Sequence, residues 1–309
     1  MACIKHKIPS SRENWKKDRL KGIGGSDAAI ALGMSPWKSQ YTLWCEKTGR
    51  INNDADNEAM RLGRDLEDYV AKRFSEETGK KVRKSTFSFQ SKEHPFMLAN
   101  VDRLIVGENA GLECKTTSAL TKTKYDKGDI PIQYYVQCMH YMAVTGKKKW
   151  YIAILVLGIG FYWYEVNWND NEIANLIARE NEFWSYVECD EEPPLDGSDS
   201  TAETIKQLYP ESDHSHVSLY DKDTTLDRYI ELKSYIKQME NEKRLIENTI
   251  KTEMENAEYA ETDKYNIKWK NFVTNRVDTK LLQKEYPDIY ASVLKESKVR
   301  KFEVKEVVE

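Results

Sequence analysis

The sequence contains no run of about 18 apolar residues and no apolar stretch near its N-terminus. A membrane-spanning helix needs about 20 such residues, so we expect neither a membrane span nor a secretory signal. The five cysteines are scattered over the 309 residues, and no two of them have C-x-x-C spacing. This absence argues against a zinc or iron–sulfur site and is typical of a reduced, cytoplasmic protein that does not bind membranes.

A net positive charge is also lacking, because the chain carries −4 at pH 7. Residues 1–190 contain 28 Lys and Arg against 25 Asp and Glu, a balance of +3, and residues 191–309 contain 19 against 26, a balance of −7. A nucleic-acid footprint would therefore be local and lie mostly in the first part. Three basic clusters are candidates, although each is also typical of a solvated surface: residues 16–21, 80–84 and 147–149.

The most informative segment of the chain is residues 96–115. Two short apolar runs flank a loop rich in Gly and Asn, which predicts a β-hairpin. Because side chains alternate along a strand, Glu113 and Lys115 point to one face, whereas Cys114 points to the other and keeps its backbone carbonyl near the first. The hairpin can bring Asp102 opposite this pair.

Two carboxylates and a carbonyl are hard oxygen ligands of the kind that Mg²⁺ prefers, and here they have an ammonium beside them. Such a set can activate and orient water for phosphodiester hydrolysis. The pattern is weak by itself, because 32% of the residues are charged. The alternative is a solvated hairpin with a Glu–Lys pair.

A long amphipathic helix predicted over residues 57–78 offers a further carboxylate. Glu67 lies at the edge of the apolar stripe of this helix. A carboxylate in that position needs a partner. The partner is either a cation, Arg64 or Arg103, or a bound metal ion.

Polar side chains also recur along one stripe of a helix predicted over residues 129–145. Gln133, Gln137 and Tyr141 are spaced four residues apart, so they lie on one face. This face either contacts a scissile DNA strand or is exposed to solvent.

Residues 22–33 predict a loop, an N-cap at Ser26 and a short helix that ends at Gly33. The free amides at the start of this helix could hold a phosphate, or Ser26 could be an ordinary cap. Trp37 follows a Ser35-Pro36 turn. It either stacks on a terminal base pair or packs in the core.

The predicted elements follow in the order helices, hairpin, helix, hairpin, helix, which indicates an α/β fold with a mixed sheet flanked by helices. The Pro193-Pro194 pair and the acidic residues after it divide the chain into a core over 1–195, an acidic linker over 196–223 and a C-terminal extension over 224–309.

Within that extension, apolar residues recur every 3.5 residues over 229–257, with interruptions at Lys243 and Glu253. We expect one long helix whose stripe packs inside the extension near Trp269 and Phe302. Strands around residues 265–273 and 299–307 would complete a small β/α unit.

Several of these segments, in this order and approximate spacing, match a known family. Residues 15–190 resemble the phage exonucleases of the YqaJ and lambda-exonuclease type, within the PD-(D/E)xK nuclease superfamily, and residues 260–309 resemble a tail common in YqaJ-type members. Val101 stands where the family pattern usually has Pro, which is not a ligand. The matching segments are Arg19, Gly24-Gly25-Ser26-Asp27, Gly63-Arg64-Asp65-Leu66-Glu67, Asn100-Val101-Asp102, Leu112-Glu113-Cys114-Lys115 and Gln133-Tyr134-Tyr135-Val136-Gln137.

The resemblance implies a restriction-endonuclease-like core and a Mg²⁺-dependent 5′-to-3′ exonuclease that digests one strand of linear duplex DNA and exposes a 3′ single strand for recombination. It implies that Asp102 and Glu113 hold the metals, two per site, with the Cys114 carbonyl and Glu67 as further ligands, and that Mn²⁺ can substitute. Lys115 would orient or deprotonate the attacking water.

The resemblance also implies how DNA binds. Arg19 and Ser26 fall where the family binds the terminal 5′-phosphate, Gln137 matches an active-site glutamine, and Asn100 belongs to the matching segment beside the carboxylates. The implied partners are double-stranded DNA ends, a single-strand annealing protein and other copies of the chain in a ring, with a trimer favoured. The location would be the cytoplasm of a bacterial host cell.

Two other functions are compatible with the sequence. The first is another PD-(D/E)xK DNA endonuclease, such as a restriction enzyme whose target-recognition region lies in the tail. The second is a non-catalytic DNA-binding or scaffold protein. Metal-dependent cleavage of linear duplex DNA separates these classes.

Overall fold

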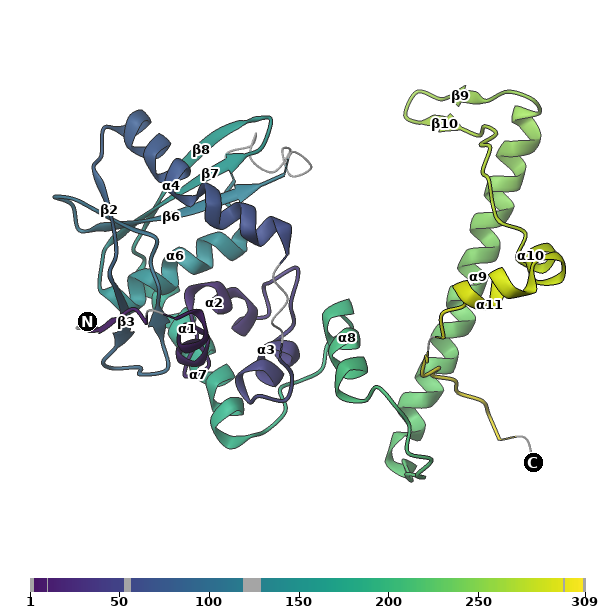
Figure 1. Cartoon of the computed structure of the whole chain (residues 1–309), viewed down its shortest axis with the longest axis horizontal. Helices are drawn as coiled ribbons and strands as arrows, with labels where there is room; N and C mark the ends of the chain where they lie inside the picture. The colour runs from purple at the N-terminus through teal and green to yellow at the C-terminus, as the bar shows by residue number, and fades with distance from the viewer. Residues whose placement is uncertain (1–2, 10, 53–56, 119–128, 297, 308–309) are drawn as a thin grey trace. The chain divides into compact units, whose positions relative to one another are not determined.

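The computed structural model describes residues 3–9, 11–52, 57–118, 129–296 and 298–307. The chain forms two compact units, Met1–Tyr209 and Pro210–Glu309 (Figure 1). Each unit is described by itself below. In the described parts of the chain, no helix has the length and apolarity needed to cross a membrane.

The first unit contains a five-stranded mixed sheet with the order β2-β5-β6-β7-β8. The central strands β6 and β7 pair in parallel, and the other neighbours are antiparallel. The apolar sequence of β7 explains its central place, because a strand buried on both faces reads as a continuous apolar run. The strands are β2 (Val82–Lys84), β5 (Arg103–Ile105), β6 (Ala110–Thr117), β7 (Lys149–Val156) and β8 (Gly160–Asn167).

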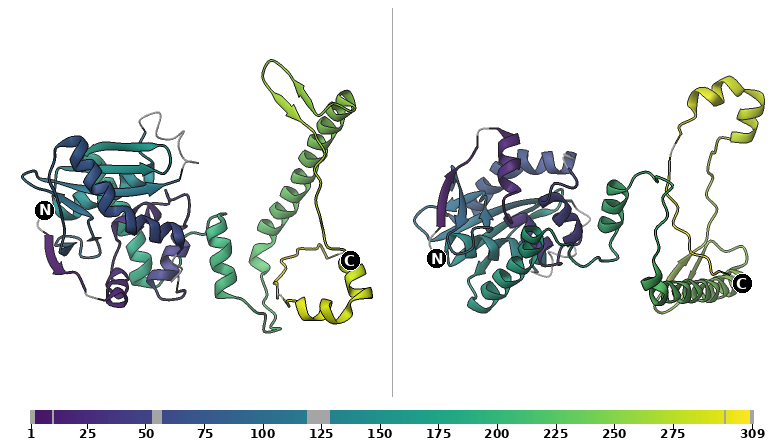
Figure 2. Two further views of the ribbon diagram at one scale, coloured as in Figure 1. Left: turned by 45° about the horizontal axis from the view of Figure 1, so that its top comes forward. Right: turned by 90° about the horizontal axis from the view of Figure 1, so that it is seen from below.

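Helices cover both faces of this sheet, which confirms the predicted fold class. The helices in the described part of the unit are α1 (Arg12–Arg19), α2 (Gly25–Ala31), α3 (Gln40–Lys47), α4 (Glu58–Thr78), α6 (Ile132–Thr145), α7 (Asp170–Cys189) and α8 (Asp199–Leu208). Val70 and Phe74 of α4 pack on one face of the sheet with Leu112 and Tyr151, and α4 stays against these strands in both further views (Figure 2). On the other face, α6 belongs to the core cluster that contains Ile152.

A second, antiparallel sheet has the order β1-β3-β4. Its strands are β1 (Cys3–Lys7), β3 (Phe87–Ser91) and β4 (Leu98–Ala99). Helix α6 contacts β3 and β4 as well as β7, so it lies between the two sheets. The candidate DNA-binding residues on α6 are thereby held from both sides.

Local sequence explains the ends of the long helices. Asn57 caps α4 by accepting a hydrogen bond from the amide of Met60 at 2.9 Å. Gly79 ends α4 with a positive φ of 70°, a conformation that favours glycine. Asn169 caps α7 in the same way as Asn57 caps α4.

Residues 199–208, which we expected in the acidic linker, form helix α8. Ser198 caps this helix, and Thr201 donates a hydrogen bond to Ser39 Oγ, the cap of α3, at 2.8 Å. Thr204 lies 2.8 Å from the Thr42 hydroxyl, also on α3. The helix faces α3 with the hydroxyl groups of two buried threonines, Thr201 and Thr204, which are not residues that a search for an apolar stripe identifies.

The second unit contains α9 (Asp223–Met254), a hairpin of β9 (Tyr259–Glu261) and β10 (Asn266–Lys268), and the helices α10 (Thr279–Glu285) and α11 (Pro287–Val293), preceded by a 3₁₀ turn at Tyr220–Lys222. The long predicted helix therefore forms.

The expectation that the apolar stripe of α9 is covered within the unit is met near both ends of the helix but not in its middle. At the C-terminal end Met254 is buried, and Trp269 lines a pocket with Asn248 and Thr252. The rings of Tyr229 and Phe302 lie 5.8 Å apart, whereas Ile236 and Met239 are 58% and 59% exposed. The strand expected over 299–307 does not form in the described residues of that segment.

Candidate active site

The predicted hairpin forms and brings the three charged residues together. Strands β5 and β6 pair with Arg103 opposite Leu112, so Asp102 lies beside the next residues of β6. Asp102 Oδ2 accepts a hydrogen bond from the Cys114 amide at 2.8 Å. Lys115 Nζ lies 2.6 Å from Glu113 Oε1, as expected for side chains two residues apart on one strand.

Helix α6 holds Glu113 from the other side. Gln137 Nε2 donates to Glu113 Oε1 at 2.7 Å and to the Tyr141 hydroxyl at 2.8 Å. Both Gln137 and Tyr141 are buried. Tyr141 therefore supports Gln137 rather than reaching a DNA strand from its own position, which corrects the expectation of a polar face open to DNA. Gln133 is half-buried one turn earlier on the same helix.

The site is bordered by a further aromatic ring, Tyr134, which the sequence analysis did not identify as a site residue. Lys115 Nζ lies 5.3 Å from the ring centroid of Tyr134, a cation–π distance. Tyr134 precedes Gln137 by three residues, so it faces the same side of α6. That spacing is the signal that could have identified it.

Glu67 is paired with a cation, one of the two alternatives that its place on α4 left open. Arg103 is buried, and its Nη1 donates to Glu67 Oε1 at 2.5 Å and to the Asp102 carbonyl at 2.7 Å. Arg103 also contacts Asp68. The Arg103 guanidinium therefore links α4 to the backbone of Asp102.

The electrostatics of the site show an excess of buried negative charge. Burial raises the pKa of Asp102 well above its usual value, and the neighbouring Glu113 and Glu67 raise it further. Burial alone would lower the pKa of Lys115, but Glu113 and Asp102 hold it above its ordinary value. Among the described residues, Glu113 Oε2 is a buried oxygen without a hydrogen-bond partner.

These residues fit a divalent cation. An unpartnered carboxylate oxygen beside a second buried carboxylate is costly unless a positive charge joins it, and both offer the oxygen ligands that Mg²⁺ prefers. Within the described residues, no three His, Cys, Asp or Glu side chains already converge on one point.

A second cluster of charges surrounds the start of α2. Arg19 Nη2 donates to Ser26 Oγ at 2.8 Å and to Asp27 Oδ1 at 3.0 Å, and Lys47 Nζ lies 2.8 Å from Asp27 Oδ2. Burial would raise the pKa of Asp27, but Lys47 and then Arg19 hold it far below its usual value. Asp27 is thus a buried carboxylate that orients the two cations.

The expected cap of α2 is displaced by two residues. Gly24, not Ser26, is the N-cap, because the Asp27 carboxylate accepts the Gly24 amide at 3.2 Å. Ser26 is therefore in the first turn, and its hydroxyl contacts Arg19 instead of closing the helix.

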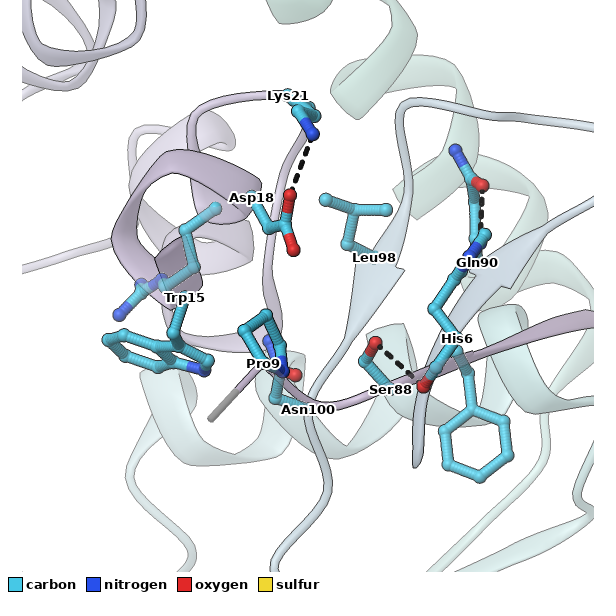
Figure 3. A pocket seen from close by; sticks show the side chains of 11 residues that line it. His6, Pro9, Trp15, Asp18, Lys21, Ser88, Gln90, Leu98 and Asn100 are labelled. Atoms are coloured by element: carbon cyan, nitrogen blue, oxygen red, sulfur yellow. Dashed lines mark hydrogen bonds and ion pairs between the residues drawn. The ribbon is translucent and has the colours of Figure 1, made fainter. Parts of the chain in front are cut away.

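Arg19 and Asn100 line the same pocket, which has a volume of about 160 Å³ (Figure 3). Trp15 and Leu98 form apolar parts of its wall. Arg19 also lies over the Trp15 ring, with its guanidinium carbon 5.0 Å from the centroid. Trp15 precedes Arg19 by one helical turn, a spacing that could have identified it in the sequence.

Trp37 is 66% exposed, so the alternative of a tryptophan packed in the core is wrong. Its amide lies 3.3 Å from Ser35 Oγ in the turn before α3. An exposed indole at this position is available for stacking.

Close packing joins the two clusters of the site. A Cβ on Gly25 would lie 2.4 Å from Tyr141 Cε1, so only glycine allows α2 to approach the tyrosine that hydrogen-bonds with Gln137.

We expect Gly25→Ala to displace Tyr141 and to cost about 1–3 kcal/mol of stability, measured by urea unfolding. Gly63→Ala is the matched control, because no atom lies within 4 Å of a Cβ there and alanine favours helix α4. Equal unfolding midpoints for Gly25→Ala and the unchanged protein would contradict this packing.

Comparisons with known proteins identify the family and agree with the fold. Residues 14–148 match the YqaJ-like viral recombinase domain. The chain is 41% identical over 304 residues to YqaJ of Bacillus subtilis (strain 168), described as an uncharacterized protein, and the match covers 96% of this chain and 95% of that one.

Solved structures of an alkaline exonuclease from Laribacter hongkongensis share the fold. One superposes with a TM-score of 0.50 at 21% identity and covers 58% of this chain and 93% of the exonuclease. The complex of LHK-Exo with dAMP superposes with a TM-score of 0.51 at 20% identity and covers 63% and 96% of the two chains. The fold is therefore that of this exonuclease, and by its sequence the chain belongs to the YqaJ-like viral recombinase family.

Proposed function

We propose that this protein is a Mg²⁺-dependent exonuclease that digests one strand of linear duplex DNA from its 5′ end. The observation that carries the proposal is the cluster of Asp102, Glu113 and Lys115, in which Glu113 is buried and one of its carboxylate oxygens has no hydrogen-bond partner. Family membership and the fold of an alkaline exonuclease support DNA as the substrate.

The residues of the hairpin would divide the work of hydrolysis. Asp102, Glu113 and the Cys114 carbonyl would hold two Mg²⁺, or Mn²⁺ in their place, and Glu67 would join them on release from Arg103. When bound, the cations would supply positive charge to the attacking and leaving oxygens. Lys115 would orient the attacking water as an ammonium, and it would take the proton of the water only in its neutral form, after losing a proton of its own.

Helix α6 would fix the second carboxylate during the reaction. Gln137 holds Glu113 Oε1 at 2.7 Å, which leaves Oε2 to face a cation. Gln133, on the same helix and half-buried, would contact the scissile strand.

The pocket around Arg19 would bind the terminal 5′-phosphate. A guanidinium can make charge-assisted hydrogen bonds with two phosphate oxygens at once, and Ser26 and Asn100 would add polar contacts. The 3′ strand left behind would then be the product used in recombination.

Trp37 would stack on the terminal base pair, as an exposed indole can. Trp37→Ala is expected to slow digestion of duplex DNA by about 5- to 150-fold, since one stacked base is worth about 1–3 kcal/mol. Single-strand digestion should change less, and Trp37→Phe should restore most of the rate. Equal slowing on both substrates would contradict the stacking role.

We also propose that copies of the chain assemble with one another. A ring of copies, favoured as a trimer, would enclose the duplex and keep a chain of net charge −4 on DNA. A single-strand annealing protein would receive the 3′ strand, in the cytoplasm of a bacterial host. The core over 1–195 would carry catalysis, and the extension over 224–309 would serve assembly or DNA grip.

Digestion of end-labelled linear duplexes tests the proposal. Substrates carrying a 5′-phosphate or a 5′-hydroxyl are incubated with Mg²⁺ or with EDTA, and the products are separated by length. We expect Mg²⁺-dependent release from 5′-phosphorylated ends. Loss of label from the 3′ end first would contradict the proposed 5′-to-3′ direction, and internal cuts in circular DNA would favour the endonuclease alternative.

A further inference from the structure

His140 and Glu180 form a buried pair beside the candidate active site. Their side chains are 0% exposed, and His140 Nδ1 lies 2.7 Å from Glu180 Oε1. Burial lowers the pKa of His140, but the Glu180 carboxylate raises it above the ordinary value. A buried ion pair adds little net stability compared with apolar side chains of similar volume, so this pair calls for another role.

The second ring nitrogen shows what the pair holds. His140 Nε2 lies 2.9 Å from the Leu98 carbonyl, and because a carbonyl only accepts, Nε2 must carry the proton. The Leu98 amide donates to the Ile23 carbonyl at 2.8 Å, directly before α2. Leu98 is thus fixed through both of its backbone groups.

Leu98 lies where the two halves of the site meet. Its side chain lines the pocket that contains Arg19 and Asn100 (Figure 3). Asn100 and Asp102 follow it along the chain by two and four residues. Any shift of Leu98 therefore moves the wall of the phosphate pocket and the first carboxylate together.

Helix α6 supplies the fixed point against which Leu98 is placed. Gln137 precedes His140 by three residues on this helix and holds Glu113 at 2.7 Å. Strand β4, which contains Leu98, pairs with β3 at only two positions. Besides this ladder and the bond to Ile23, the bond from His140 is a further polar contact that holds the backbone of Leu98 in place.

We propose that His140 and Glu180 are positioning residues that set the separation between the phosphate pocket and the carboxylates, and thereby the selection of 5′-phosphorylated ends. The inference rests on the proposed function, because it needs the Arg19 pocket to bind a terminal phosphate. Glu180 fixes the orientation of the ring, and the ring fixes Leu98.

Two substitutions of His140 separate the bond to Leu98 from the bond to Glu180. Glutamine is long enough to place an amide where Nε2 lies, so His140→Gln keeps the donor to Leu98. Asparagine ends near Nδ1, so His140→Asn keeps a contact with Glu180 and loses Leu98. Both variants replace the ring with a neutral amide, and each is therefore a matched control for the other.

The measurement is binding of the full chain to duplexes with 5′-phosphate or 5′-hydroxyl ends, in EDTA, with no cleavage. We expect His140→Asn to reduce the preference for the phosphate about fivefold, the value of one hydrogen bond, and His140→Gln to stay within about twofold of the unchanged protein. Equal preferences in the two variants would overturn the inference.

If His140→Asn does not fold, the same binding measurement is made with Glu180→Gln and Glu180→Ala in place of the two His140 variants. Glu180→Gln keeps a hydrogen bond to the ring and should keep the preference, whereas Glu180→Ala should lose it; equal preferences would again overturn the inference. An unchanged protein without any phosphate preference would overturn the proposed pocket itself, so the two failures are distinguishable.

Discussion

Asp102→Asn will reduce Mg²⁺-dependent cleavage of linear duplex DNA by about 10³-fold or more, which corresponds to about 4 kcal/mol of transition-state stabilisation. The amide keeps the shape of the side chain and can still accept the Cys114 hydrogen bond. It lacks the charge needed to hold a cation beside Glu113. We expect Glu113→Gln and Lys115→Ala to abolish cleavage in the same assay.

The fold of Asp102→Asn should survive without metal. Burial and the nearby Glu113 and Glu67 already disfavour the charged form of Asp102, so removal of that charge relieves repulsion. In EDTA the midpoint of thermal unfolding should therefore stay equal or rise, whereas added Mg²⁺ should stabilise only the unchanged protein. Cleavage within about tenfold of the unchanged protein would remove Asp102 from the active site.

Arg19→Ala will abolish the preference for 5′-phosphorylated ends. Charge-assisted hydrogen bonds are worth about 1.5–3 kcal/mol, so the ratio of cleavage rates for 5′-phosphate and 5′-hydroxyl ends should fall about 10- to 100-fold. Asp27 keeps Lys47 as a partner at 2.8 Å, and the start of α2 should therefore remain folded.

Lys17→Ala is the matched control, because Lys17 lies on the same helix α1 and pairs with the exposed Glu13. It removes one positive charge at a similar place in the sequence without touching the pocket. The rate ratio should stay as in the unchanged protein. A similar fall in both variants would show that general electrostatic attraction, and not a pocket for the terminal phosphate, sets the preference.

The parts of the site that are local in sequence could be predicted. The alternation of Glu113 and Lys115 along one strand, and a Gly-rich loop that returns the chain beside Asp102, follow from the geometry of a hairpin. The four-residue spacing of Gln137 and Tyr141 likewise placed them on one face of a helix. It could not show which face is buried, because burial depends on β6 and on α2.

Interactions between segments that are far apart in the chain could not be predicted from the sequence. His140 and Glu180 are 40 residues apart and meet only because α6 packs on α7. Whether Glu67 pairs with an arginine or with a metal ion depended on the direction of the Arg103 side chain, which comes from strand β5. The exposure of Trp37 was undecided for the same reason, since a turn does not reveal what covers it.

Periodicity had a similar limit in the second unit. The 3.5-residue spacing predicts α9, but it does not identify the surface that its apolar stripe contacts. Ile236 and Met239 remain exposed in the described structure, so the division of labour between the units stays a prediction.

The parallel pairing of β6 with β7 has a consequence for the newly made chain. These strands align from Ala110 opposite Lys149 to Thr117 opposite Val156, and a parallel pair cannot form until the crossover between its strands is complete. A chain that has left the ribosome only as far as residue 117 has the three charged residues of the hairpin. It lacks β7 and the helix that holds Glu113. Because pairing of distant segments is slow, we expect the capacity to cut DNA to arise late in synthesis, after β7 has paired with β6.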